Sequence, residues 1–259
     1  MVPTRCGELA VHRTTGDGDT LVCLHGFTLG GAMFATFSDV SGVAVAAPDL
    51  PGHGATTVAP VDLASTMAAL RDWIADRFAA QVAAGGIDVL GYSQGGRIAL
   101  HLAMTHPELV ARIVVVSAGP GLPEAERTVR HAADSMLADH IEEVGLDRFL
   151  DEWLANPLIN ASGGATDADR RLRTGNSAAG LAAALRGLGQ GVLAPVDPSE
   201  LAVPSLWVAG AEDLHYIEIA DRSARTSGGD LVVIEGAGHN VVADAPHLLA
   251  DAVAGFRRT

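Results

Sequence analysis

The chain has 259 residues, of which 48% are hydrophobic, and its formal net charge is −14. This length can bury a full core and suits one large domain, while the acidic balance argues against a nucleic-acid-binding surface, which would be basic. Every charged basic side chain is an arginine. The lack of lysine excludes a lysine Schiff-base enzyme and a Walker A nucleotide site.

No apolar run of the sequence is as long as a membrane span, and the first residues lack the apolar stretch of a signal peptide. We therefore expect a cytoplasmic protein that acts on a small molecule, and we expect neither a membrane nor a nucleic acid as its partner. The composition leaves the oligomeric state open.

Short apolar runs bounded by glycine or proline recur along the chain and predict buried strands of a parallel sheet. Amphipathic helical stretches such as residues 63–79 lie between most of these runs, which is the β-α-β rhythm of a doubly wound sheet. The sequence therefore predicts the α/β fold class. The predicted strands are residues 20–24, 43–47, 87–90, 113–116, 205–209 and 231–234.

One long segment interrupts this rhythm. Residues 121–189 have no strand signal and are helical, arginine-rich and polar, with a flexible loop predicted at residues 162–164. We predict a helical lid over residues 121–189, inserted into a core formed by residues 1–120 and 190–259.

Ser93 is the first candidate for catalysis. It is the serine of a G-x-S-x-G motif, residues 91–95, that follows a predicted strand and precedes a predicted helix. The flanking glycines Gly91 and Gly95 stand where a Cβ would crowd the sharp turn that exposes the serine hydroxyl. This context predicts a nucleophile or a base at Ser93, whereas an ordinary turn serine is the alternative.

A serine at neutral pH needs a base, and the base needs an orienting acid. Asp213 and His239 each follow a later predicted strand, so the order Ser93, Asp213, His239 is that of an α/β-hydrolase triad. Glu212 is the alternative acid. A ligand-binding member of such a fold would be indicated by loss of the serine or the histidine, and both are present.

An oxyanion hole requires backbone N–H groups that are fixed before the reaction. Phe27 follows His25-Gly26 at the end of an early strand, and Gln94 opens the helix after Ser93. We expect their N–H groups to form the hole.

These motifs together, with the loop at residues 49–54, resemble the α/β-hydrolase superfamily over essentially the whole chain. The resemblance implies an α/β-hydrolase fold with a mostly parallel sheet and a lid. Serine at position 93 argues against the dehalogenases and epoxide hydrolases of this superfamily, which use a carboxylate nucleophile.

A narrower resemblance rests on residues 91–97, 120–122 and 153–157, which look like the 2-succinyl-6-hydroxy-2,4-cyclohexadiene-1-carboxylate (SHCHC) synthases of menaquinone biosynthesis. In that family arginines bind the carboxylates of the substrate. The resemblance implies substrate contacts at His25, Tyr92, Arg97, Arg130, Trp153 and Arg173, with Arg171 as the alternative to Arg173. Arg130 and Arg173 have the alternative of helix-surface ion pairs, which most charged helix residues form.

The family resemblance implies a carbon-oxygen lyase in which His239 deprotonates Ser93 and the alkoxide removes a proton from the substrate, so that pyruvate leaves. No cofactor and no metal is required. The alternative is a carboxylesterase or C–C hydrolase that forms an acyl-enzyme on Ser93. Both reactions use the same triad and oxyanion hole, so the sequence does not separate them.

Overall fold

The computed structural model describes residues 1–156 and 166–258. The flexible loop predicted at residues 162–164 and the end of the 153–157 motif lie outside this range. None of the described helices combines the length and the hydropathy that a membrane span requires.

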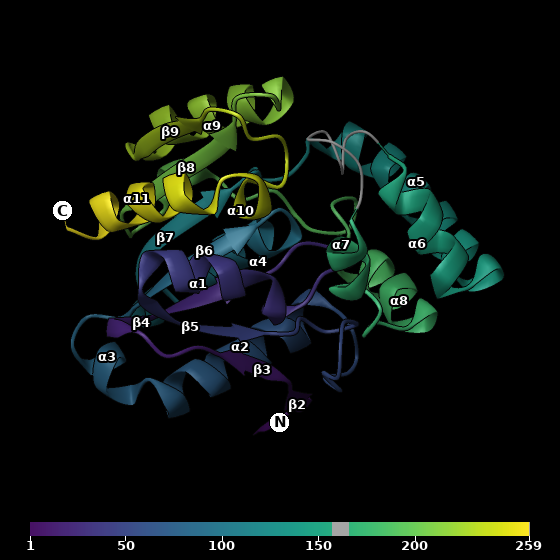
Figure 1. Ribbon diagram of the computed structural model, residues 1–259, viewed down its shortest axis with the longest axis horizontal. Helices are drawn as coiled ribbons and strands as arrows, with labels where there is room; N and C mark the ends of the chain where they lie inside the picture. Colours follow the sequence, from purple (N-terminus) through teal and green to yellow (C-terminus); the bar gives the residue numbers. More distant parts are fainter. Residues whose placement is uncertain (157–165, 259) are drawn as a thin grey trace.

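A twisted sheet of seven strands forms the centre of the described structure, in the order β3-β5-β4-β6-β7-β8-β9 (Figure 1). Strands β4 to β9 pair in parallel, and only β3 at one edge is antiparallel to its neighbour. The strands are β1 (Val2–Thr4), β2 (Gly7–Leu9), β3 (Val11–Arg13), β4 (Asp17–Leu24), β5 (Val43–Pro48), β6 (Ile87–Tyr92), β7 (Val110–Val116), β8 (Ser205–Gly210) and β9 (Asp230–Ile234).

Helices cover both faces of the sheet, so the predicted α/β class and the α/β-hydrolase arrangement are confirmed. Side chains of α2, α4 and α9 pack on one face, and those of α1 and α11 pack on the other. The helices are α1 (Ala35–Ser41), α2 (Leu63–Arg77), α3 (Ala79–Ala83), α4 (Gln94–Thr105), α5 (Glu124–Val144), α6 (Leu146–Leu154), α7 (Asp167–Arg171), α8 (Ala178–Leu188), α9 (Leu214–Ser227), α10 (Val241–Asp244) and α11 (Pro246–Arg257).

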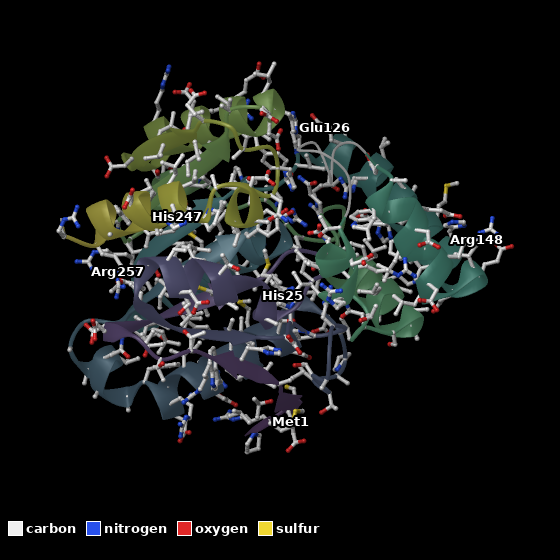
Figure 2. The ribbon with its side chains drawn as sticks, in the orientation of Figure 1. Met1, His25, Glu126, Arg148, His247 and Arg257 are labelled. Atoms are coloured by element: carbon white, nitrogen blue, oxygen red, sulfur yellow. The ribbon has the colours of Figure 1, made fainter. Side chains whose placement is uncertain are left out.

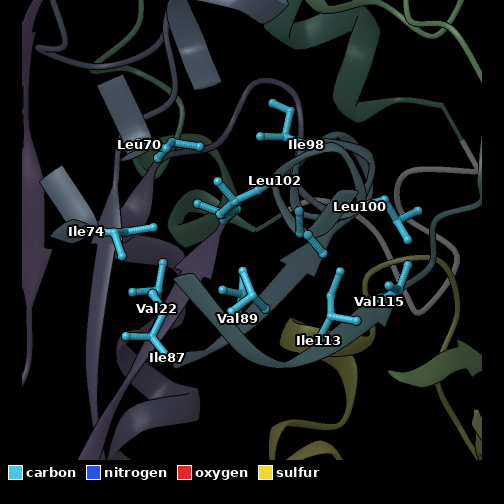
Figure 3. Close-up of a cluster of buried hydrophobic side chains, with 14 of the residues drawn as sticks. Val22, Leu70, Ile74, Ile87, Val89, Ile98, Leu100, Leu102, Ile113 and Val115 are labelled. Carbon is cyan, nitrogen blue, oxygen red and sulfur yellow. The ribbon is translucent and has the colours of Figure 1, made fainter. Parts of the chain in front are cut away.

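A hydrophobic core lies beneath α4, the helix that follows Ser93. Val89 of β6 and Ile113 of β7 are fully buried in the same hydrophobic cluster as Ile98 and Leu102 of α4 (Figure 3). Burial of each such aliphatic side chain contributes about 1.5–3 kcal/mol. The end of β6 and the start of α4 are therefore held rigidly.

One sequence prediction about the strands needs correction, and three strands were not predicted. The strand predicted at residues 231–234 is β9, but it is an edge strand whose Leu231 and Val233 are each 37% exposed, so it is not buried. The short strands β1 to β3 were not predicted, because they are only three residues long and mix polar with apolar residues.

Helices α5 to α8 lie between β7 and β8 in the chain and form a separate group beside the carboxyl ends of the strands (Figure 1). They have a small hydrophobic cluster of their own that includes Ile141, Phe149 and Leu181. These helices fall within the segment predicted as a lid. The exact division into core and lid stays a prediction.

Candidate active site

Ser93 lies between β6 and α4 with φ 52° and ψ −112°, a backbone conformation that L-residues rarely adopt. The two flanking glycines permit this turn. A Cβ on Gly91 would lie 2.4 Å from the carbonyl oxygen of Gly95, and a Cβ on Gly95 would lie 2.1 Å from that of Leu24. Only glycine fits at either position, and the strained turn sets Ser93 at the carboxyl end of the sheet.

His239 and Asp213 form a hydrogen-bonded chain with Ser93. The Nε2 of His239 lies 3.1 Å from the Oγ of Ser93, and its Nδ1 lies 2.8 Å from the Oδ2 of Asp213. A carboxylate can only accept, so Nδ1 carries the proton and Nε2 is left to accept the serine proton. Glu212, the alternative acid, is exposed and is not part of this chain.

The charge of Asp213 is stabilised locally. Burial raises the pKa of this carboxyl, but hydrogen bonds from His239 and from the Tyr216 N–H outweigh burial, so the pKa lies below its ordinary value. A negative charge beside Nδ1 stabilises the imidazolium that forms when His239 takes a proton.

Phe27, whose N–H is the first expected donor, lies in the Gly26–Leu29 turn. The Gly26 carbonyl accepts from the Leu29 N–H (3.2 Å) and from Nδ1 of His25 (2.8 Å). The next N–H, that of Phe27, points the opposite way across the trans peptide. A Cβ on Gly26 would lie 3.5 Å from the Cβ of Ser93, so this turn packs directly against the serine.

The Gln94 N–H is the second expected donor. Gln94 is the first residue of α4, so its N–H has no acceptor inside the helix. The helix dipole adds partial positive charge at this end. The role of the Phe27 and Gln94 N–H groups as an oxyanion hole stays a prediction.

His25 is buried in the interior of the molecule (Figure 2), and backbone groups occupy both of its ring nitrogens. Nδ1 donates to the Gly26 carbonyl, and Nε2 accepts from the Leu50 N–H at 2.8 Å. Neither nitrogen is left for the substrate contact that the resemblance implied. The ring instead connects the loop after β4 to the loop after β5.

His53 lies next to His25, with the ring centroids 4.9 Å apart and edge to face. Its Nδ1 donates to the Pro51 carbonyl, and its Nε2 accepts from the Thr28 N–H. Burial lowers the pKa of His25 to about 4, and burial with the nearby His25 lowers the pKa of His53 to about 3. Both rings are therefore neutral at pH 7.

Two tyrosine rings pack against His239. The ring centroid of Tyr216 is 4.8 Å from that of His239, and the centroid of Tyr92 is 5.7 Å away. Burial raises the pKa of Tyr92. Trp153 of α6 packs edge to face on Phe27, with the centroids 5.5 Å apart, so it connects the inserted helices to the turn beside Ser93.

Arg97 is the most unusual charge in this region. It lies one helical turn after Ser93, and its N–H donates to the serine carbonyl. Only 9% of the residue is exposed, yet among the described residues its Nε has no hydrogen-bond partner. Burial lowers its pKa, although an arginine stays protonated at neutral pH. Burial of such a cation costs free energy unless an anion, such as a ligand carboxylate, lies beside it.

Arg173 points inward and Arg171 outward. Arg173 is 3% exposed, and its Nε donates to the Thr28 hydroxyl (3.2 Å), while Arg171 is exposed. Arg130 differs from both, because its Nε binds the buried carboxylate of Asp134 at 2.7 Å on the same helix. The helix-surface ion pair considered for Arg130 is therefore present.

No three His, Cys, Asp or Glu side chains of the described residues are grouped so that they could hold a metal ion. A cavity of about 560 Å³ lies at the opposite end of the sheet from Ser93, where Asp88 and Arg112 line it. Arg112 and Arg257 neutralise the Asp88 carboxylate there. The chemistry-bearing residues thus gather at the carboxyl ends of the strands.

Several residues of this region were missed by the sequence analysis. Tyr216 is three residues after Asp213, so its proximity to His239 could have been inferred from the helix that begins there. Thr28 contacts His53 and Asn176 only through the fold, and no sequence pattern marks Thr28 or Asn176.

The sheet order and the Ser93-His239-Asp213 chain together define a protein of the α/β-hydrolase class. A family model described as the alpha/beta hydrolase family matches residues 21–252, and the chain belongs to this family. The superfamily resemblance drawn from the motifs is confirmed.

Relatives named as SHCHC synthases match most of the chain, which confirms the narrower resemblance. A putative 2-succinyl-6-hydroxy-2,4-cyclohexadiene-1-carboxylate synthase of Bacillus subtilis (strain 168) is 34% identical over 254 residues, or 92% of this chain and 90% of the relative. A synthase of the same name from Klebsiella pneumoniae is 30% identical over 76% of this chain and 77% of its own length.

Solved structures agree with this assignment. The structure of MenH from S. aureus is 25% identical with a TM-score of 0.86, covering 96% of this chain and 97% of that one. A malate-bound esterase from Thermogutta terrifontis is 21% identical with a TM-score of 0.77, covering 96% of this chain and 93% of that one, a likeness of fold.

Proposed function

We propose that this protein is an SHCHC synthase that eliminates pyruvate from a multiply carboxylated cyclohexene. Relatives of that name and the hydrogen-bonded chain at Ser93 support the proposal. The observation that carries it is Arg97, a buried cation one helical turn from the serine whose Nε has no hydrogen-bond partner among the described residues. A neutral ester gives no reason to bury such a charge, whereas a substrate carboxylate neutralises it bidentately.

The reaction begins with proton transfer. His239 accepts the Ser93 proton at Nε2, and Asp213 stabilises the imidazolium through Nδ1. The Ser93 alkoxide then acts as a base and takes a proton from the carbon beside the succinyl carbonyl. A new O–H bond forms on Ser93, and the electron pair of the broken C–H bond moves into the carbonyl as an enolate.

The N–H groups of Phe27 and Gln94 stabilise the enolate oxygen, which carries more negative charge than the ground-state carbonyl. The enolate collapses, its electron pair passes into the ring as a new double bond, and the C–O bond to the enolpyruvyl group breaks. The leaving oxygen recovers the proton from His239, and the released enol becomes pyruvate. Arg97 and Arg173 hold substrate carboxylates, while Tyr92 and Trp153 line the site.

The test is pyruvate release from 2-succinyl-5-enolpyruvyl-6-hydroxy-3-cyclohexene-1-carboxylate, corrected for spontaneous decay. We expect fast release by the wild type that is lost in both Ser93→Ala and Arg97→Ala. Release at the background rate, together with Ser93-dependent and Arg97-independent turnover of a short p-nitrophenyl ester, would overturn the lyase and leave a carboxylesterase with an acyl-enzyme on Ser93.

A further inference from the structure

Thr28, directly after Phe27, has an unfavourable backbone conformation. Its φ is 69°, in the left-handed region, where a β-branched residue is an outlier. Thr28 is fully buried and is the third residue of the Gly26–Leu29 turn, closed by the bond from the Leu29 N–H to the Gly26 carbonyl. The direction of the Phe27 N–H depends on this turn, so whatever holds Thr28 also holds that N–H.

Three hydrogen bonds hold Thr28 from outside its own turn. Its N–H donates to the Nε2 of His53 (3.3 Å), its hydroxyl accepts from the Nε of Arg173 (3.2 Å), and its carbonyl accepts from the Nδ2 of Asn176 (2.6 Å). Two of these partners come from the turn after α7, within the inserted helical segment. That segment is therefore joined to the loop beside Ser93 by specific polar contacts.

The side chain of Asn176 connects three parts of the chain. Besides the bond to Thr28, its Nδ2 donates to the Arg173 carbonyl (3.0 Å), and its Oδ1 accepts from the Gly54 N–H (2.8 Å). Both amide donors and the amide oxygen are thus used. This amide therefore fixes three segments relative to one another: the turn after α7, the loop after β4 and the loop after β5.

We propose that Asn176 is a positioning residue that holds Thr28 in its left-handed conformation and thereby aims the Phe27 N–H at the oxygen that gains charge in the reaction. The inference rests on the proposed function, because that function makes the Phe27 N–H an oxyanion donor. Asn176 touches neither the reacting atoms nor Ser93, and it acts through Thr28.

The same turn also carries Arg173, the inward-facing arginine. Because Arg173 and Asn176 both bind Thr28, the cation for a substrate carboxylate and the donor for the enolate oxygen are fixed at one separation. A substrate held by Arg173 therefore meets the Phe27 N–H without further adjustment, which lowers the barrier through orientation.

The experiment compares Asn176→Ala with Gln81→Ala. Gln81 is the matched control, because its side-chain amide also donates to a backbone carbonyl, that of Thr20, at the far end of the sheet. For Asn176→Ala we expect kcat for pyruvate release to fall about 10-fold to 100-fold with KM changed less than about threefold, since loss of alignment acts on the transition state. Gln81→Ala keeps both constants.

Hydrogen exchange gives a readout that needs no substrate. In Asn176→Ala the amides of residues 26–29 should exchange faster than in the wild type, and in Gln81→Ala they should not. If the alanine variant does not fold, Asn176→Asp replaces it in both measurements. Aspartate keeps the shape of the side chain and the acceptor for the Gly54 N–H, but it lacks the two N–H donors.

A double-mutant cycle tests the role of Thr28. Glycine adopts the left-handed region unaided, so the loss of kcat caused by Asn176→Ala should be smaller in a Thr28→Gly background. Unchanged kcat and exchange in Asn176→Ala, or equal losses in both backgrounds, would overturn the proposal. If the wild type releases no pyruvate, the proposed function fails while the exchange measurement still decides the role of Asn176.

Discussion

Arg130 donates from its Nε to Oδ1 of Asp134, 2.7 Å away on the next turn of α5, and this carboxylate is almost fully buried. Arg97, on α4, differs from Arg130, because its buried Nε has no hydrogen-bond partner among the described residues. The two guanidinium groups therefore make opposite contributions. Arg130 pairs with a buried carboxylate, whereas the Nε of Arg97 is buried without a hydrogen-bond partner.

We predict opposite stability changes for the two arginines. Arg97→Met removes a buried cation whose Nε has no hydrogen-bond partner and should raise the free energy of unfolding by about 1 kcal/mol, whereas Arg130→Met leaves the buried Asp134 carboxylate without its arginine and should lower it by about 1–3 kcal/mol. Urea denaturation at pH 7 measures both. Pyruvate release should fall by at least about 100-fold in Arg97→Met. Destabilisation by Arg97→Met would show that a protein group already satisfies that guanidinium.

The assignment of the acid predicts a large difference between two neighbouring positions. Asp213→Asn should lower kcat for pyruvate release about 10³-fold to 10⁴-fold, because an amide no longer fixes the Nδ1–H tautomer or stabilises the imidazolium. Glu212→Gln, one residue away and exposed, is the control and should change kcat less than about twofold. A larger loss in Glu212→Gln than in Asp213→Asn would assign the acid to Glu212.

The neutral state of His25 and His53 predicts a loss of stability in mild acid. Each Nε2 accepts from a backbone N–H, so a proton there would face another donor. Because the pKa of each folded ring is depressed to about 4 or about 3, the unfolded chain binds more protons below pH 6.5. The contribution of these two histidines to the free energy of unfolding is fully present above pH 6.5, and it is lost progressively as the pH falls toward 4.

The expected slope is about 1.4 kcal/mol per pH unit for each histidine. Urea denaturation between pH 6.5 and 5 should show the wild-type slope reduced by about this amount in His53→Gln. His247→Gln, on the exposed surface of α11, controls for the replacement itself. A His53→Gln slope equal to that of the wild type would mean that His53 is not held neutral in the fold.

The contact between Tyr216 and His239 predicts that the ring matters more than the hydroxyl. Tyr216→Phe keeps the ring that packs 4.8 Å from the imidazole and should retain kcat within about threefold, whereas Tyr216→Leu frees His239 and should lower kcat about 10-fold. Steady-state pyruvate release measures both. Equal losses in the two variants would assign the effect to the hydroxyl instead.

Local patterns in the sequence were enough to predict several features of the site and of the sheet. The G-x-S-x-G turn predicted the place of Ser93 because steric limits act over five consecutive residues. The apolar runs predicted the parallel strands because the strands inside the sheet are buried through their own side chains, although the edge strand β9 is not. The order of the motifs along the chain also predicted which loops carry the acid and the histidine.

Which of two neighbouring residues faces the site became clear only from the packed fold. Asp213 and Glu212, or Arg173 and Arg171, have the same chemistry, and their directions depend on how a whole helix packs. Ser93 and His239 are 146 positions apart, and Thr28 and Asn176 are 148 apart. A hydrogen bond over such a separation forms only after the intervening elements have packed, so no local pattern of residues can encode it.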